Sequence, residues 1–555
     1  MSSVSDVADA YMAALVAIDP IVGTEIGDAA SSSRLPDFSP AGLAAREALV
    51  SGTLLQLGSA TVDGDAERSA RTVLAEALEA QRDRQRIGEP FRRLRNYDAP
   101  LDEIRVGFDL MPTGAADDWD AVVARMRAVP EAVAGVEATL REGLARGLPA
   151  ARRQAAVVGA QALAWGGLSG DGYFTRLLAG APQLPAALHA DAQAAATAAE
   201  TALAHHAEFL ATEYAPSATD TDAVGRERYA VAARANTGMV IDLDATYAWG
   251  WEELRRIALD IDDTAAKIVE GGGLDAAREL LNTDTTRAIH GVDAFREWLQ
   301  ALTDRTIEEL DGRHFDIAPH ARRVECMIAP PGGAAAMYYT SPSQDWSRPG
   351  RTWYPAGDRT VFPMWEEVTT AYHEGVPGHH LQQVSAMTAE PTLTSYQRFR
   401  FNSGHGEGWA LYAERLMDEL GYHEQPDTRL GMLTGSAFRA ARVVVDIGLH
   451  LELAIPADAP FHPGERWDFD LAREFIGDHV ARGDPFVTSE VQRYLGMPGQ
   501  AISYKVGERE WLDIRAEVRA RQGAAFDLKS FHTHALGLGP MGLAQLRDEL
   551  TQRAE

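Results

Sequence analysis

Cysteine is almost absent from this sequence of 555 residues, because Cys326 is the only one. A single cysteine excludes an internal disulfide framework and any metal site built from several cysteines. The surrounding residues, RRVECMIAP, are typical of a strand, where a lone cysteine is usually a small buried side chain and not a nucleophile. The lack of disulfides agrees with a reducing compartment, so we expect a cytoplasmic protein.

Long hydrophobic runs are absent as well. No stretch of about eighteen apolar residues occurs, and the N-terminal segment lacks the basic residues that open a signal peptide. The mean hydropathy is -0.22, and the hydrophobic fraction of 46% beside 24% charged residues is ordinary for a globular chain. We therefore expect a soluble protein with no membrane partner.

Positive charge is scarce. The 52 lysines and arginines face 81 aspartates and glutamates, which gives a formal net charge of -29, and the pI is near 5.0. Nucleic acids and anionic lipids are bound mainly through lysine and arginine, so this balance opposes both as partners. A peptide or another small molecule is the expected substrate, and the sequence does not predict an oligomeric state.

Helix-forming patterns dominate what is present. Stretches such as 149–167 and 190–216 combine alanine, leucine and arginine with apolar residues three and four apart. Residues 313–357 change to short runs of aromatic and β-branched residues between prolines and glycines, which predicts a small sheet. The chain exceeds the usual size of one core. We predict a mainly α fold with an N-terminal helical lobe at 1–310 and a catalytic lobe at 311–555, closely packed or merged into one domain.

Histidine is concentrated in the last third of the chain, where ten of the sixteen lie at or after His373. The segment TTAYHEGVPGHHLQQ (369–383) begins as the HExxH zinc motif begins, with His373 and Glu374. In that motif the second histidine follows at i+4, about 40° round and about 6 Å along the helix, so that two imidazoles hold one ion. Here the i+4 position is Pro377.

A straight helix cannot bring the next histidines to His373. His379 would lie about 120° round the helix, and His380 would share the face of His373 but lie about 10.5 Å along the axis. Pro377 and Gly378 favour a distortion, because proline donates no backbone hydrogen bond and glycine tolerates unusual dihedral angles. A bulge of two residues would place His379 at the i+4 position, and a bulge of three would place His380 there. We prefer His379, which needs the smaller insertion.

The third ligand is expected from the segment 401–420, where Glu407 opens an amphipathic helix. Two histidines and a glutamate with an open fourth position form a common catalytic zinc set. Glu414 and His405 are lesser candidates in the same segment. One zinc per chain is the expected cofactor, although the same ligands also hold iron or manganese. The alternative is that these side chains are ordinary polar residues of amphipathic helices.

Five segments together resemble the bacterial domain-of-unknown-function 885 family, whose members look like distant relatives of zinc metallopeptidases of the gluzincin type. They are HEGVPGHH (373–380), EGWALYAE (407–414), SRPG (347–350), RAARVVVDIGLH (439–450) and RYLGMPGQAISYKVGE (493–508). The resemblance implies a large, helical, two-lobed zincin-like fold that encloses a cleft or channel, with a small sheet near the metal helix. It also implies that Glu374 is the general base, with His373, His379 or His380, and Glu407 as ligands.

The implied reaction is hydrolysis of amide bonds in small or unfolded peptides, with the metal activating a water molecule. Tyr504 is our first candidate for a second donor to the oxyanion. Arg442 suits a substrate carboxylate through its forked donors, and His450 is a further candidate for substrate binding. Asp446 is expected to orient a ligand histidine.

Residues 332–342 are expected to form an edge strand, with Tyr338 or Tyr339 facing the substrate. The same residues are also compatible with a simple packed hairpin.

Two other functions remain open from the sequence. One is a metal enzyme of another class that acts on a small metabolite with a C–N bond. The other is a catalytically inactive helical binding protein, which Pro377 at the i+4 position supports.

Overall fold

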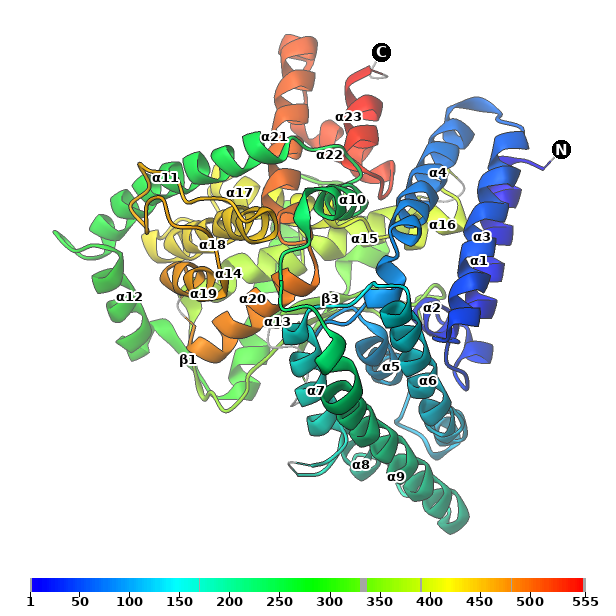
Figure 1. The fold of residues 1–555 in the computed structure, drawn as a ribbon. Coiled ribbons are helices and arrows are strands. Elements are labelled where there is room, and N and C mark those ends of the chain that lie inside the picture. Colours follow the sequence, from blue (N-terminus) through cyan, green and yellow to red (C-terminus); the bar gives the residue numbers. More distant parts are fainter. Residues whose placement is uncertain (1, 169, 330–336, 390–391, 481, 553–555) are drawn as a thin grey trace. The chain divides into compact units, whose positions relative to one another are not determined.

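A computed structural model describes residues 2–168, 170–329, 337–389, 392–480 and 482–552 (Figure 1). Helices make up 69% of the chain and strands 5%, which confirms the prediction of a mainly helical protein with a small sheet. The chain divides into two compact units. The first comprises Met1–Arg71, Ala77–Val231 and Gln492–Met497, and the second comprises Thr72–Glu76, Ala232–Val491 and Pro498–Glu555.

The first unit is built from helices, of which α6 and α9 run along each other (Figure 1). Large side chains of α6, such as Trp119 and Met126, share a buried core with alanines of α9, such as Ala195 and Ala199. Small residues let two helices approach closely. The helices with residues in this unit are α1 (Val4–Ile18), α2 (Pro20–Ile26), α3 (Pro40–Ser59), α4 (Gly64–Arg86), α5 (Pro100–Asp109), α6 (Trp119–Ala145), α7 (Arg152–Trp165), α8 (Tyr173–Ala179), α9 (Ala186–Phe209), α10 (Gly225–Thr237) and α20 (Asp484–Gly496).

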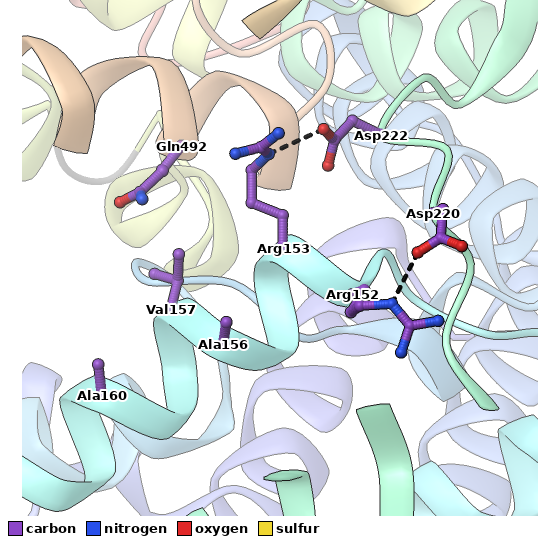
Figure 2. A pocket seen from close by; sticks show the side chains of 8 residues that line it. All are labelled: Arg152, Arg153, Ala156, Val157, Ala160, Asp220, Asp222 and Gln492. Carbon is purple, nitrogen blue, oxygen red and sulfur yellow. Dashed lines mark hydrogen bonds and ion pairs between the residues drawn. The ribbon is translucent and has the colours of Figure 1, made fainter. Parts of the chain in front are cut away.

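A pocket of about 600 Å³ lies within the first unit (Figure 2). Its two arginines are paired with aspartates, Arg152 with Asp220 at 2.6 Å and Arg153 with Asp222 at 2.8 Å. Ala156, Val157, Ala160 and Gln492 complete the lining. The pocket contains none of the residues that the sequence predicts for the site. Because its charges are balanced, it offers no clear catalytic group.

The second unit holds all the predicted site residues. Its helices are α11 (Leu243–Ile268), α12 (Leu274–Thr283), α13 (Val292–Leu310), α14 (Met364–Glu374), α15 (His379–Thr388), α16 (Ser395–Phe399), α17 (Ser403–Glu419), α18 (Pro426–Leu451), α19 (Phe469–Asp478), α21 (Ser503–Gln522), α22 (Leu528–Gly537) and α23 (Leu543–Gln552). Helices α11 to α13 belong here although the sequence boundary of 310/311 assigns them to the N-terminal lobe. The reason is close packing: a Cβ on Gly250 of α11 would lie 3.0 Å from Val444 and 3.2 Å from Val443 of α18.

Two small sheets belong to the second unit. Strand β4 (Gly350–Tyr354) lies between β2 (Val324–Ile328), which is parallel to it, and β3 (Tyr338–Thr340), which is antiparallel. Strands β1 (Ala288–His290) and β5 (Val361–Pro363) form an antiparallel pair. The expected edge strand is therefore present as β3, while residues 332–336 of that prediction lie outside the described part of the chain.

Cys326 is buried in β2 beside the hydroxyls of Thr303 and Thr352. Burial raises the pKa of its thiol, which agrees with a structural side chain and not a nucleophile.

Among the described residues, no single helix has the length and apolar character to cross a membrane; the bent pair α1 and α2, at 116° to each other, passes that test only when both helices are taken together.

Candidate metal centre

The helix that begins the motif ends at Glu374, and a new helix begins at His379. Between them the Gly378 N–H donates to the carbonyl of Tyr372 at 2.9 Å, and the His380 N–H donates to Gly375 at 3.1 Å. These bonds span six and five residues, whereas an α-helical bond spans four. The chain therefore takes up two extra residues at the break, so that His379 follows His373 where an i+4 histidine would in a regular helix.

The break is fixed by close contacts. The indole N–H of Trp409 on α17 donates to the carbonyls of Pro377 at 2.8 Å and Gly378 at 3.3 Å. The Val376–Pro377 peptide bond is cis. A Cβ on Gly378 would lie 1.9 Å from the His373 carbonyl oxygen, so only glycine fits. The Pro-Gly pair thus meets a steric requirement of the backbone beside the two histidines.

Three side chains meet across this break. The Nε2 atoms of His373 and His379 each lie 3.4 Å from Oε2 of Glu407, and the two rings are nearly perpendicular, with centroids 4.8 Å apart. One ligand atom from each residue lies within 4.8 Å of the others. Zinc bonds of about 2.0–2.1 Å in a tetrahedron place neighbouring ligand atoms about 3.3–3.4 Å apart. The two distances to Glu407 therefore fit a shared ion better than direct hydrogen bonds.

Glu414 stands behind His373. The Nδ1–H of His373 donates to Oε1 of Glu414 at 2.7 Å, and the Thr369 hydroxyl donates to the other carboxylate oxygen. This contact favours the neutral tautomer with its proton on Nδ1, whose Nε2 lone pair is available to a metal ion. Glu414, a lesser ligand candidate from the sequence, thus occupies the orienting position that we expected of Asp446.

Asp446 lies elsewhere on α18. It accepts a hydrogen bond from the Gly499 N–H at 2.9 Å and lies 3.7 Å from Nε2 of His450.

His380 faces away from this group. Its Nε2–H donates to the carbonyl of Ala321 at 3.0 Å, and its Nδ1 accepts from the Tyr339 hydroxyl at 2.9 Å. Burial lowers the pKa of His380 to about 4, so the ring is neutral at pH 7. Because both ring nitrogens are already bonded, the structure brings His379 and not His380 to Glu407.

The electrostatics of the centre favour positive charge. Burial opposes protonation of His373, but the nearby carboxylates of Glu407 and Glu414 outweigh it and raise its pKa to about 9. Burial also acts to raise the pKa of Glu407, yet the close contacts with the two histidines hold it well below its usual range. Carboxylates on both sides of His373, Glu414 buried and Glu407 partly buried, therefore stabilise a cation at this point.

Glu374 is the last residue of α14 and is buried next to the two histidines. Burial raises its pKa, and the charges of His373 and His379 partly oppose that rise. Among the described residues its carboxylate has no hydrogen-bond partner. A carboxylate with a raised pKa and no partner is suited to accept a proton.

Tyr504 and Arg442 also lie at the centre. Tyr504, in the first turn of α21, stacks on His373 with ring centroids 6.4 Å apart. The Arg442 guanidinium lies over the Tyr504 ring at 4.8 Å and bonds to Glu490 at 2.8 Å. His450, two turns further along α18, is 0% exposed. Its role in substrate binding stays a prediction.

The tyrosines of β3 have other contacts. Tyr338 stacks on Trp353 of β4, with ring centroids 5.8 Å apart, and the Tyr339 hydroxyl bonds to His380. A Cβ on Gly350 would lie 2.6 Å from both the Tyr339 hydroxyl and His380 Nδ1. The Tyr339 hydroxyl and the His380 ring are therefore enclosed by the sheet. Through this hydrogen bond Tyr339 joins β3 to α15, the helix that carries His379.

Two neighbours of the centre were missed from the sequence. Phe401 is 50% exposed, and its ring meets His379 edge to face at 6.2 Å. Arg439 places Nη2 3.8 Å from Oε1 of Glu414. The orienting role of Glu414 did have a signal in the sequence. The seven residues from Glu407 to Glu414 are about two helical turns, which places both side chains on one face of α17. No pattern in the sequence marks Phe401.

Comparison with solved structures supports the fold. A crystal structure described as a putative lipoprotein from Colwellia psychrerythraea is similar with a TM-score of 0.85 and 23% identity, over 100% of this chain and 99% of that one. A second, described as a putative lipoprotein of unknown function from Shewanella oneidensis, has a TM-score of 0.71 and 18% identity, over 99% of both chains. No curated protein matches this chain.

One family matches nearly the whole chain. It is described as a bacterial protein of unknown function, DUF885, and the match covers residues 20–550. The resemblance drawn from the five segments is thereby confirmed at the level of the family. This chain belongs to the DUF885 family of bacterial proteins of unknown function.

Proposed function

We propose that this protein is a zinc-dependent hydrolase, a metallopeptidase that cleaves amide bonds of small or unfolded peptides. One observation carries the proposal: two imidazole nitrogens each lie 3.4 Å from the same oxygen of Glu407, and Glu414 orients one of the imidazoles from behind. A pair of histidines, a glutamate and a supporting carboxylate form a typical catalytic zinc site.

Each residue has a distinct task in the proposed reaction. His373, His379 and Glu407 would hold a zinc ion, which would supply a Lewis acid for a scissile carbonyl and a water molecule. Glu374 takes a proton from that water as its oxygen bonds to the carbonyl carbon. Glu374 then passes the proton to the amide nitrogen as the C–N bond breaks, so the products are a carboxylic acid and an amine. The Tyr504 hydroxyl donates a hydrogen bond to the developing oxyanion.

The zincin-like cleft that the resemblance implies is part of this proposal. A substrate in extended form would lie beside α15, near strand β3. Supporting this, Tyr339 and Ser341 both bond to α15, through His380 and Gln383 respectively. These contacts hold the strand against the helix that carries the metal ligand.

The first experiment measures metal content and activity on the same sample. Elemental analysis after dialysis should find about one zinc per chain, and an internally quenched peptide library should be cleaved until a chelator is added. Glu374→Gln should keep the zinc and lose the cleavage, since removing a positioned acid–base group costs about 10²–10⁴-fold in rate. The matched control is Glu424→Gln at an exposed position of the same unit, which should behave as the wild type.

Other outcomes of that experiment point to the alternatives. Activity that requires iron and oxygen would replace the peptidase by a metal enzyme of another class. A chain that binds no metal and cleaves no peptide would be a helical binding protein.

The cellular location is a separate question. The cytoplasmic location expected from the sequence stays a prediction, and the names of the two similar structures, both described as lipoproteins, bear against it. Fractionation of cells that make the full-length protein would decide between cytoplasm and membrane.

A further inference from the structure

Helix α18 is buried along most of its length. Between Leu430 and His450, all of which are described, only Gly435 and Arg439 are not buried. They are four residues apart and therefore share one face of the helix. Glu407 and Tyr504 are likewise only partly buried. Solvent therefore reaches α18 at Arg439, in the same unit as the metal centre.

Arg439 is close to the centre but has no hydrogen bond there. Its side chain is 20% exposed, and Nη2 lies 3.8 Å from Oε1 of Glu414, the oxygen that His373 already uses. Its Nε is buried without a partner. Among the described residues the guanidinium donates no hydrogen bond at all. A largely buried arginine normally has most of its five donors satisfied.

The neighbouring backbone leaves room for this guanidinium. A Cβ on Gly435 would lie 2.8 Å from Nη1 of Arg439, so the bare glycine one turn earlier lets the guanidinium lie against the helix. Its charge also reaches Glu374, where burial raises the pKa and the positive charges of the two ligand histidines and of Arg439 partly oppose that rise. The charge of Arg439 thus acts both on the proposed base and on the carboxylate that orients His373.

Arg442, three residues later, is differently placed. Its guanidinium is bonded to Glu490 at 2.8 Å and lies over the rings of Phe438 and Tyr504. An arginine already paired with a buried carboxylate has little left to offer an anion. The unsatisfied donors at the centre are those of Arg439.

We propose that Arg439 binds the carboxylate of a peptide substrate, close to the bond that is cleaved, and so selects peptides that carry a carboxylate within a residue or two of that bond. This proposal rests on the proposed peptidase function. Arginine matches a carboxylate with two parallel N–H donors, and such a ligand would give the guanidinium the hydrogen bonds that it lacks. The carboxylate could be a free C-terminus or an acidic side chain.

The first test measures binding without turnover. The zinc-loaded, full-length Glu374→Gln protein is titrated calorimetrically with three peptides: N-acetyl-Phe-Ala-Ala with a free carboxylate, the same peptide as its C-terminal amide, and N-acetyl-Phe-Ala-Asp amide. Hydrogen bonds to charged groups predict about 10- to 100-fold tighter binding of a carboxylate peptide than of the amide. Tighter binding of the first peptide alone would show that the site recognises a free C-terminus. Equally tight binding of the third would show that it recognises any nearby carboxylate.

The second test removes the arginine from the same protein. Arg439→Gln should abolish the preference without changing the affinity for the amide, and Arg439→Lys should keep part of it. The matched control is Arg429→Gln on the same helix, because Arg429 is already bonded to Asp418 at 3.2 Å and Thr264 at 2.7 Å. Zinc content and circular dichroism of each variant show whether it is folded.

Several results would overturn the role of Arg439. They are equal binding of the acid and amide peptides, no binding of either, or a preference that survives in a folded Arg439→Gln protein. Should Arg439→Gln fail to fold, the Lys variant decides. Lysine lacks the forked pair of donors, so full retention of the preference in Arg439→Lys would also contradict the proposal. Hydrolysis of both peptides at equal rates by the wild type would reject Arg439 but leave the peptidase. Tighter binding of the acid peptides with no hydrolysis of any peptide would support the role of Arg439 and reject the peptidase.

Discussion

Replacing Gly378 by alanine should disrupt the metal centre through the backbone. A Cβ there would lie 1.9 Å from the His373 carbonyl oxygen and 2.4 Å from the Tyr372 carbonyl oxygen. Non-bonded heavy atoms ordinarily stay about 3.5 Å or more apart. Because both opposing atoms are backbone, no side-chain rotation can relieve the overlap.

The size of the effect follows from these contacts. Overpacking costs about 1–3 kcal/mol when side chains can adjust, and a backbone shift here would also weaken the two bonds from Trp409, at about 1 kcal/mol each. We expect a loss of about 3–5 kcal/mol in the free energy of unfolding, which lowers Tm by roughly 5 °C in a unit of this size. Zinc affinity should fall at least about 10-fold, since His379 follows directly and ligand geometry would change.

Differential scanning fluorimetry and competition with a chromogenic zinc chelator measure both quantities. The matched control is Gly477→Ala in α19, where a Cβ would have nothing within 4 Å. That change should be neutral or raise stability by up to about 1 kcal/mol, because alanine favours a helix. A Gly378→Ala protein with the Tm and zinc affinity of the wild type would refute the steric argument.

Three further changes test the centre and its surroundings. Glu414→Gln should weaken zinc binding about 10- to 100-fold in chelator competition, because His373 loses its charged partner; an unchanged affinity would contradict the orienting role. Tyr504→Phe should lower kcat about 10²–10³-fold with zinc content unchanged, as for loss of one oxyanion donor, and equal kcat would exclude that task. Burial lowers the pKa of His532 to about 3, so below about pH 6.5 the unfolded chain takes up a proton that the folded chain refuses, and stability falls by about 1.4 kcal/mol per pH unit. In His532→Gln the free energy of unfolding, measured in urea between pH 6.5 and 4, should lose this part of its pH dependence. An unchanged slope would count against this role of His532.

Much of this architecture follows from local sequence. The helical periodicity predicts the mainly α fold. The short runs of aromatic and β-branched residues that begin near residue 313 predict the small sheet. The break between α14 and α15 also follows from short-range chemistry, because Pro377 cannot continue the hydrogen bonding and Gly378 alone fits beside His373. The number of extra residues does not follow from this chemistry, because two would bring His379 round to His373 and three would bring His380.

Long-range packing decides what the sequence leaves open. Whether His379 or His380 turns toward Glu407 depends on Tyr339 and Ala321, which are distant in sequence and bond to both nitrogens of His380. The boundary of the units depends on α11 lying against α18, which no local pattern reveals. The prediction of a lobe ending at residue 310 rested on composition, and composition does not report which helices pack together.

The two arginines of α18 show the same limit at the level of one side chain. Arg439 and Arg442 are equally suitable from the sequence, since both occur in RAARVVVDIGLH and both carry forked donors. Their difference comes from partners on other helices: Glu490 of α20 bonds to Arg442, whereas Arg439 is left 3.8 Å from Glu414 with its Nε buried and unpaired. Unsatisfied buried donors cost free energy unless a ligand meets them. The better candidate for binding an anion is therefore the arginine that the fold leaves without a hydrogen-bond partner among the described residues.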